Sequence, residues 1–270
     1  MTWMGSAFGV RFGSVSHVCT SCCVFELWLT SSPGHYRLWE NGVHHGDISL
    51  NNLMYDVCAE TGNPVGIVND FDLATWVDHP TTNNDRTGTI PFMAIDLLNG
   101  GLDRRIPRLY RHDLESFIWV LAYITVTYKE YTDHNIKLSS PGVGAWFKDR
   151  DEADRKTHVM SKRLFHLEHG NEQLVFRSHL NYAGAVKQMT RYWADFHRMK
   201  HTLRFDSPVM MARVQKPTTN KPELDPRSTV REFVATVEEL LGERVPGDGF
   251  AEVKTLLLKA IETPIVTVKA

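Results

Sequence analysis

The amino-acid sequence predicts an α+β fold that is mostly α-helical and carries one small β-hairpin. Two short apolar runs, residues 53–55 and 65–68, flank the turn-rich stretch CAETGNP, which is the pattern of two paired strands joined by a loop. Apolar residues at helical spacing recur over much of the remaining chain. Because 42% of the 270 residues are hydrophobic, the chain is long enough to bury a sizeable core.

The first half of the chain contains two further predicted elements. Residues 1–32 show neither helical nor strand periodicity, so we expect a poorly defined segment there. Residues 34–43 resemble the last turns of a helix that ends at Gly42. Residues 113–126 have apolar side chains at helical spacing and on the other faces as well, which predicts a central, buried helix.

Helical patterns recur in the second half of the chain, at residues 151–168, 179–201, 228–241 and 250–261. The pattern at 228–241 opens with Thr229 and Glu232 at capping-box spacing and ends at Gly242. The stretch 217–226, rich in Pro, Lys and Thr, is the plausible internal linker. We therefore divide the chain into a poorly defined N-terminal segment, a central domain, and a linker with a C-terminal helical tail, at residues 1–32, 33–215 and 216–270.

Charge and cysteine content bear on the partners and the compartment. Thirty basic and 32 acidic residues leave a formal net charge of −2, so we expect no partnership with nucleic acid or membranes. The four cysteines are too few and too clustered for a disulfide framework, which indicates a reducing intracellular compartment, cytoplasm or nucleus. The longest apolar stretch, 117–126, has about half the length that spans a bilayer. We also expect no secretory signal at the N-terminus.

The strongest functional signal is the segment 45–52, which reads HGDISLNN. His45 precedes Asp47 by two positions, and Asn52 follows Asp47 by five, which is the spacing of a kinase catalytic loop. The spacing has a physical cause, because the aspartate accepts or orients the attacking hydroxyl. The asparagine meanwhile projects toward a metal ion that bridges the phosphates.

A second signal follows the predicted hairpin, where residues 68–72 read VNDFD. This places Asp70 at the end of an apolar strand, where a kinase has its magnesium-binding aspartate, although the motif is Asp-Phe-Asp and not Asp-Phe-Gly. Magnesium prefers hard oxygen ligands and usually keeps several waters. Asp70 and Asn52 therefore suffice as protein ligands beside substrate phosphates.

Two more segments complete the set, RTGTIPFMAID at 86–96 and RHDLES at 111–116. They look like the end of an activation segment and the start of the helix behind it. In their order and distances, the four motifs resemble the fungal-type protein kinase family over residues 34–126. The resemblance implies the C-terminal lobe of a protein kinase-like fold, with ATP and Mg²⁺ as cofactors. It also implies transfer of the ATP γ-phosphate to serine or threonine of a protein.

The same resemblance implies a role for each site residue. Asp47 is the catalytic base, Thr89 supports the base and the substrate hydroxyl, and Ser49 stands where serine/threonine kinases usually carry a lysine. Asn52 and Asp70 bind Mg²⁺ and through it the nucleotide. His45 and Asp113 are structural supports, because a buried Asp at a helix N-terminus needs donors such as the N–H groups of a tight loop. For Thr89 and Asp96, a helix cap and a surface charge are the competing interpretations.

The sequence also departs from the kinase pattern. No lysine precedes Lys129, and no Gly-x-Gly-x-x-Gly loop is present, so the N-terminal lobe is missing or degenerate. Gly46 stands where many kinases carry an arginine. One alternative is therefore a catalytically dead pseudokinase or truncated fragment that acts as a binding module for a partner protein. A second is a small-molecule phosphotransferase of the aminoglycoside or choline kinase type, against which the 86–96 and 111–116 segments favour a protein substrate.

Overall fold

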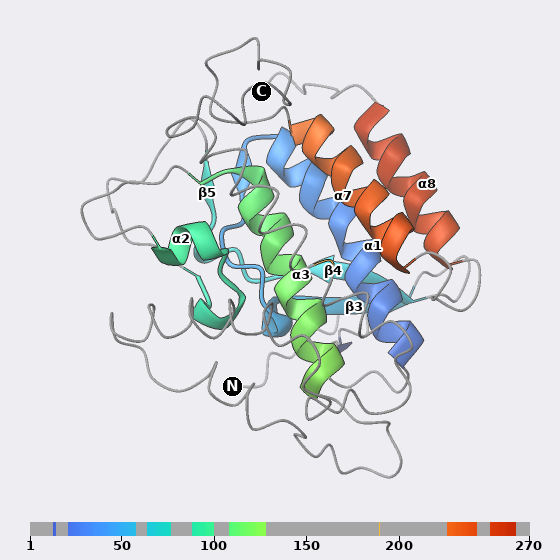
Figure 1. Ribbon diagram of the computed structural model, residues 1–270. Coiled ribbons are helices and arrows are strands. Elements are labelled where there is room, and N and C mark those ends of the chain that lie inside the picture. The colour runs from blue at the N-terminus through green and yellow to red at the C-terminus, as the bar shows by residue number, and fades with distance from the viewer. Residues whose placement is uncertain are drawn as a thin grey trace, which may run out of the picture.

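A computed structural model describes part of the chain, and the α+β prediction is confirmed within it. Long helices and two small antiparallel sheets make up this part, as Figure 1 shows. The described residues are 13–14, 21–57, 64–76, 88–99, 108–127, 189, 226–241 and 249–262. The predicted helices at 151–168 and 179–201 lie outside them, apart from the buried helical residue Met189.

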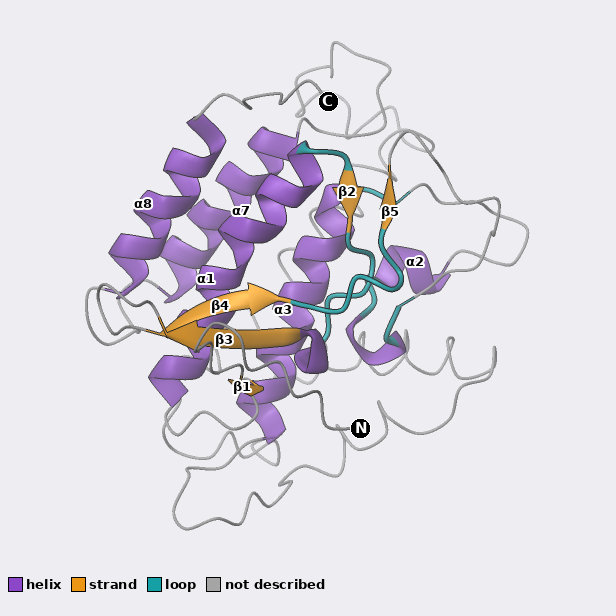
Figure 2. Cartoon of the chain, turned by 180° about the vertical axis from the view of Figure 1, so that it is seen from behind, coloured by secondary structure: helices purple, strands orange, loops and turns teal. Residues whose placement is uncertain are grey.

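The predicted hairpin is confirmed and is longer than its apolar runs. Strand β3 (Leu53–Val57) pairs antiparallel with β4 (Pro64–Val68), and Leu53 lies opposite Val68. The two-residue strand β1 (Gly13–Ser14) pairs with the other edge of β3. Figure 2 shows this sheet lying across one of the long helices, α1. The open end of the hairpin therefore brings the residues just before 53 and just after 68 together.

A second, two-stranded sheet lies at the other end of the 45–52 loop. Strand β2 (Val43–His44) pairs antiparallel with β5 (Thr75–Trp76). The 45–52 loop thus runs from β2 into β3, and residues 69–74 run from β4 into β5. Because both connections leave one sheet and enter the other, they lie next to each other, as Figure 2 shows.

Helix α1 (Ser21–Glu40) begins well before the position that the sequence predicted. Its buried side chains Trp28, Tyr36 and Trp39 recur at helical spacing and form the face that packs into the core. The helix ends before Gly42, as predicted, and the Gly42 N–H donates to the carbonyl of Trp39 at 3.0 Å. Residues 21–32, where the sequence showed no helical periodicity, form the first turns of α1. Several Ser and Cys residues and the following Pro33 obscured the helix in the sequence.

Helix α3 (Tyr110–Thr127) is the predicted central helix, and its burial is confirmed. Phe117 and Trp119 on different faces are both completely buried. The Trp28 indole N–H donates to the backbone carbonyl of Phe117, and the two rings meet edge to face at 6.4 Å. From Tyr110 to Ala122 every side chain is buried, which explains why apolar residues occur on several faces of this helix.

Helices α7 (Pro226–Leu241) and α8 (Gly249–Glu262) complete the described core. The predicted helix at 250–261 is confirmed as α8. Helix α7 begins at Pro226, so Thr229 is a buried residue within its first turn and the predicted capping box is wrong. Phe233 of α7 packs against Trp28 of α1 with ring centroids 5.8 Å apart, so these helices share one core with α1 and α3. The proposed domain boundary at 215–216 lies outside the described residues.

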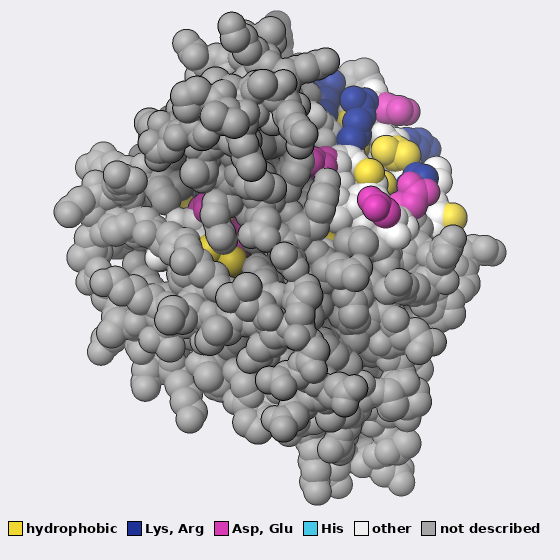
Figure 3. All heavy atoms as spheres, viewed as in Figure 1, with side chains coloured by type: hydrophobic (Ala, Val, Ile, Leu, Met, Phe, Trp, Pro, Cys, Tyr) yellow, Lys and Arg dark blue, Asp and Glu magenta, His cyan; other side chains and the backbone are white. Residues whose placement is uncertain are grey.

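The outer face of α7 and α8 carries mixed charges. Figure 3 shows basic and acidic side chains intermingled there with a few hydrophobic ones. Lys254 of α8 donates to the carboxylate of Glu238 on α7, which links the two helices at the surface. Within the part of the chain that the structure describes, no helix is both long and apolar enough to cross a bilayer.

Short elements position the remaining segments of the candidate site. The 45–52 loop ends in the 3₁₀ turn η2 (Leu50–Asn52), which turns Asn52 back toward Asp47. The described part of the 86–96 segment contains η3 (Ile90–Phe92) and begins the short helix α2 (Ile95–Asn99). Thr89 immediately precedes η3.

Candidate active site

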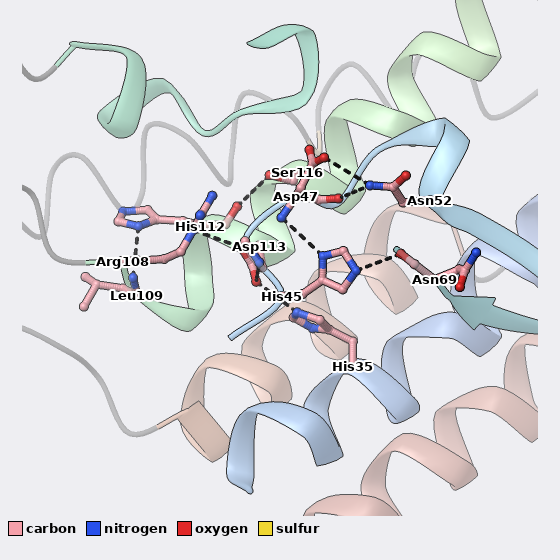
Figure 4. Close-up of polar contacts among 11 residues, drawn as sticks. His35, His45, Asp47, Asn52, Asn69, Arg108, Leu109, His112, Asp113 and Ser116 are labelled. Carbon is pink, nitrogen blue, oxygen red and sulfur yellow. Dashed lines mark hydrogen bonds and ion pairs between the residues drawn. The ribbon is translucent and has the colours of Figure 1, made fainter. Parts of the chain in front are cut away.

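The 45–52 loop lies between the N-terminal end of α3 and the connection that follows β4, and Figure 4 shows its polar contacts. Gly46 permits the sharp turn at the start of the loop, because its φ of 80° lies in the left-handed region that favours glycine. Asp47 follows this turn and is only partly buried. The loop therefore presents one carboxylate toward the 88–96 segment.

Both oxygens of the Asp47 carboxylate receive hydrogen bonds. Oδ1 accepts the backbone N–H of Thr89 at 2.6 Å and its hydroxyl at 2.7 Å. Oδ2 accepts the side-chain amide N–H of Asn52 at 3.1 Å. Hydrogen bonds to a charged carboxylate are stronger than those between neutral groups, so they fix its orientation. The sequence-predicted residues Asp47, Asn52 and Thr89 thus meet at one point.

Asn52 is buried, and the same amide nitrogen also donates to the backbone carbonyl of Asp47 at 2.8 Å. These two bonds define which end of the amide is nitrogen, since a carboxylate and a carbonyl can only accept. The amide oxygen consequently points away from Asp47, as Figure 4 shows. This orientation presents an oxygen ligand on the far side of the amide.

Asp70 lies close to Asn52 because the hairpin register brings their backbones together. The N–H of Asn69 donates to the carbonyl of Asn52 at 2.8 Å, one residue before Asp70. Asp70 is exposed and has a φ of 64°, a left-handed conformation that costs a non-glycine residue about 1 kcal/mol and that Asp tolerates better than most. Strain of this kind at a residue predicted to bind metal is consistent with a functional constraint.

The oxygen atoms of Asn52 and Asp70 fit Mg²⁺ only together with further ligands. One amide oxygen and one carboxylate are hard ligands of the kind that Mg²⁺ prefers, and phosphates and waters would complete its octahedral shell. Among the described residues, no three His, Cys, Asp or Glu side chains gather closely enough to hold a metal by themselves. The donor set therefore suits an ion that arrives with a phosphate substrate.

His45 connects the loop to the residue before Asp70. Its Nδ1 accepts the N–H of Asp47 at 3.2 Å, so the ring proton must be on Nε2, which donates to the carbonyl of Asn69 at 2.9 Å. Burial lowers the pKa of His45, which favours this neutral form. The ring also meets Phe71 at 4.9 Å between centroids. These contacts fix the backbone on either side of the site, so His45 has a structural role.

Asp113 lies in the first turn of α3 and is 1% exposed. Its Oδ2 accepts from His35 Nε2 at 3.0 Å and lies 3.4 Å from the backbone nitrogen of Gly46, and its Oδ1 forms an ion pair with Arg108 at 3.5 Å. Burial alone raises the pKa of a carboxyl group, but the His35 hydrogen bond and the Arg108 charge outweigh it. The pKa of Asp113 is therefore held below its usual range.

Sequence reasoning found the Asp113 contact with the loop backbone but missed His35, its closest hydrogen-bonding partner. A single histidine within a helix matches no motif, and the pair is separated by 78 positions. The ring of His35 also stacks on Tyr110 at 5.3 Å, one turn before Asp113. No signal in a single sequence would have joined these residues.

Ser49 is itself part of the 45–52 loop. It is almost completely buried, and its backbone carbonyl accepts the N–H of Asn52 at 3.1 Å. Its side chain does not cap the 3₁₀ turn that follows. The structure thus places Ser49 next to the site residues, and its catalytic role stays a prediction.

Two polar contacts between α3 and α2 hold the end of the 86–96 segment, and the sequence did not predict them. Glu115 accepts the backbone N–H of Ile95 at 2.8 Å, and Arg111 donates to Asp96 at 2.7 Å. Asp96 is therefore an ion-pair partner and more than a surface charge. These contacts fix α2 on α3, and through it they position Thr89.

Comparison with known proteins finds a family match for one part of the chain. No curated protein matches it. The family model described as fungal protein kinase matches residues 23–125, a range that contains most of α1, the 45–52 loop, the hairpin, the 86–96 segment and most of α3. Every residue discussed above for the site lies within it. Residues 23–125 thus carry the match to the fungal protein kinase family.

Proposed function

We propose that this chain contributes the C-terminal lobe of a protein kinase site, which transfers the ATP γ-phosphate to a serine or threonine hydroxyl of a protein. The observation that carries the proposal is the Asp47 carboxylate held by Thr89 on one oxygen and by Asn52 on the other. A fixed, partly accessible carboxylate next to two oxygen ligands is the arrangement that phosphoryl transfer requires.

In this proposal Asp47 orients the substrate hydroxyl and accepts its proton as the oxygen attacks the γ-phosphorus of ATP, and the bond from that phosphorus to the leaving ADP breaks. Thr89 and Asn52 aim the carboxylate, which reduces the reorganisation needed at the moment of reaction. His45 links the 45–52 loop to the backbone next to Asp70 through its hydrogen bond to the Asn69 carbonyl. When bound, magnesium-ATP would supply the transferred phosphoryl group and neutralise the charge on its oxygens, with Asn52 and Asp70 as protein ligands.

A binding module that does not turn over ATP is the second candidate function. It is supported by the absence of any lysine from residues 1–128, because a phosphate-clamping lysine is part of the kinase mechanism. In this alternative the same contacts around Asp47 would maintain only the shape of a surface for a partner protein.

Thermal unfolding with and without magnesium-ATP separates the two candidates. A ligand stabilises the folded state that binds it, by about 2.7 kcal/mol at a hundredfold excess over Kd. The kinase proposal predicts a magnesium-dependent rise of the melting temperature that Asp70→Asn abolishes. Asp56→Asn, the same substitution on β3 of the hairpin, is the matched control and should keep the rise. No shift in the unsubstituted chain would contradict the kinase proposal and support the binding module.

A further inference from the structure

Arg108 reaches from the residues just before α3 to the turn of the 45–52 loop. A Cβ atom added to Gly46 would lie 2.6 Å from Nη1 of Arg108, which is closer than real Cβ contacts come. A Cβ added to Gly88 would lie 3.7 Å from Nη2 of the same guanidinium and 3.1 Å from the Gly46 carbonyl oxygen. One guanidinium group therefore lies against both glycines.

The Arg108 side chain also pairs with Asp113 through its Nε atom. Nε of Arg108 lies 3.5 Å from Oδ1 of Asp113, whose pKa is lowered partly by this charge. The Arg108 side chain is 21% exposed, so most of it is enclosed. Figure 4 shows Arg108 and Asp113 lying side by side at the start of α3. A planar, always charged group in this position can contact several partners at fixed angles.

The two glycines belong to the two segments that must meet for Asp47 to be oriented. Gly46 immediately precedes Asp47, and Gly88 immediately precedes Thr89, whose N–H and hydroxyl bind the Asp47 carboxylate. Both glycines have positive φ, 80° and 135°. A side chain on Gly46 would displace the guanidinium, because Nη1 is the end of a flexible side chain and can move more easily than backbone.

We propose that Arg108 is a positioning residue that joins the 45–52 loop to Thr89 by pairing with Asp113 and lying against Gly46 and Gly88. It acts through the backbone of both segments and touches no reacting atom. The inference deepens the proposed function, since it concerns the geometry of the same site. Its test does not depend on turnover.

Amide hydrogen exchange of the full chain tests the proposal at two named amides. The Asp47 N–H donates to His45, and the Thr89 N–H donates to the Asp47 carboxylate. Exchange at the Asp47 amide therefore reports on the 45–52 loop, and exchange at the Thr89 amide reports on the contact between that loop and the segment of Thr89. In Arg108→Ala we expect both amides to exchange at least about tenfold faster, with the amides of α7 and α8 unchanged. Arg231→Ala, which removes an exposed arginine from α7, is the matched control and should change neither amide.

Arg108→Lys keeps the measurement decisive if the alanine variant fails to fold. Lysine retains the charge near Asp113 but lacks the planar fork that reaches both glycines. Exchange at the Thr89 amide should still accelerate. Unchanged exchange at Thr89 in the lysine variant, or an equal acceleration in every helix, would overturn the proposal, because a purely structural arginine would act on all amides alike.

A double-mutant cycle supplies an independent readout. Gly46→Ala should displace the Arg108 guanidinium. Most of the contacts that Arg108→Ala removes would then already be lost in the Gly46→Ala variant. We expect the double variant to exchange at Thr89 no faster than Gly46→Ala alone. Multiplying effects would contradict the proposal, since sites that do not interact give additive free energies.

Kinetics distinguish this inference from the proposed function. If the chain transfers phosphate, Arg108→Ala should lower kcat with little change in the KM for ATP, because positioning acts on the reacting geometry. Absence of turnover in every variant would count against the proposed function only. Faster exchange confined to the Asp47 and Thr89 amides would still support the proposal that Arg108 holds the 45–52 loop and Thr89 together.

Discussion

At the scale of single residues, the candidate site depends on hydrogen bonds that each have a defined donor. Asp47 is an acceptor for Thr89 and Asn52, and the backbone N–H of Asp47 is a donor to His45. Every one of these bonds joins residues that the sequence singled out. The types of residue were predictable from motif spacing, whereas the direction of each bond required the structure.

Thr89→Val tests the hydroxyl bond to Asp47. Valine keeps the shape and the backbone N–H but removes one of the two donors to Oδ1. We expect a loss of about 1 kcal/mol in the free energy of unfolding and, if the chain transfers phosphate, a fall in kcat greater than the change in KM. Thr89→Ser retains the hydroxyl and is the control. Equal values for valine, serine and the unsubstituted chain would show that the hydroxyl bond contributes nothing.

The protonation state of His45 gives the site a predictable pH dependence. Burial lowers the pKa of His45 in the folded state, so the unfolded state binds a proton first as the pH falls. Its contribution to stability is fully present above about pH 6.5 and is lost as the pH falls from there through the folded pKa. Protonation would place a second donor opposite the N–H of Asp47.

Urea denaturation between pH 8 and pH 5 measures this effect. We expect His45→Gln to unfold at lower urea concentration at pH 8 and to show a shallower loss of stability toward pH 5. Part of the slope should persist, because burial also lowers the pKa of the neighbouring His44. The charged and titratable groups that act on His45 itself are Asp113, His35 and Asp47. Identical pH slopes in both proteins would contradict the neutral form described here.

At the scale of secondary structure, strong periodicity was predictive and composition was misleading. The hairpin and α3 were found because few structures besides a strand pair and a buried helix produce such apolar patterns. The first turns of α1 were missed because its Ser and Cys residues and Pro33 argue against a helix. Tertiary packing outweighs that propensity, since Trp28, Tyr36 and Trp39 are buried along one face.

Trp28 should be the most sensitive position in α1. It is 1% exposed, donates to Phe117 of α3 and packs against Phe233 of α7. We expect Trp28→Ala to lower the free energy of unfolding by about 3–5 kcal/mol, the usual cost of emptying a buried aromatic site. Trp76→Ala is the control, because Trp76 is 59% exposed and its loss should cost about 0.5 kcal/mol or less. Similar costs for both would mean that α1 does not pack as described.

At the scale of the whole molecule, α1 and α7, which come from opposite ends of the described chain, both pack against α3. Glu40 at the end of α1 accepts from Arg227 at the start of α7 at 3.1 Å, which links residues 187 positions apart. Contacts of this range cannot be deduced from one sequence, because local patterns carry no information about partners. For the same reason Arg108 and His35 were not recognised as neighbours of Asp113.

The most direct measurement is transfer of labelled γ-phosphate from magnesium-ATP to a generic acceptor protein. Asp47→Asn preserves the size of the side chain but cannot accept the proton, so it should lower the rate at least about a hundredfold. Glu239→Gln, at an exposed position on α7, should leave the rate unchanged and serves as the control. Turnover that depends on Asp47 is the result we predict. Turnover that is unaffected by Asp47→Asn would contradict the central role of this carboxylate.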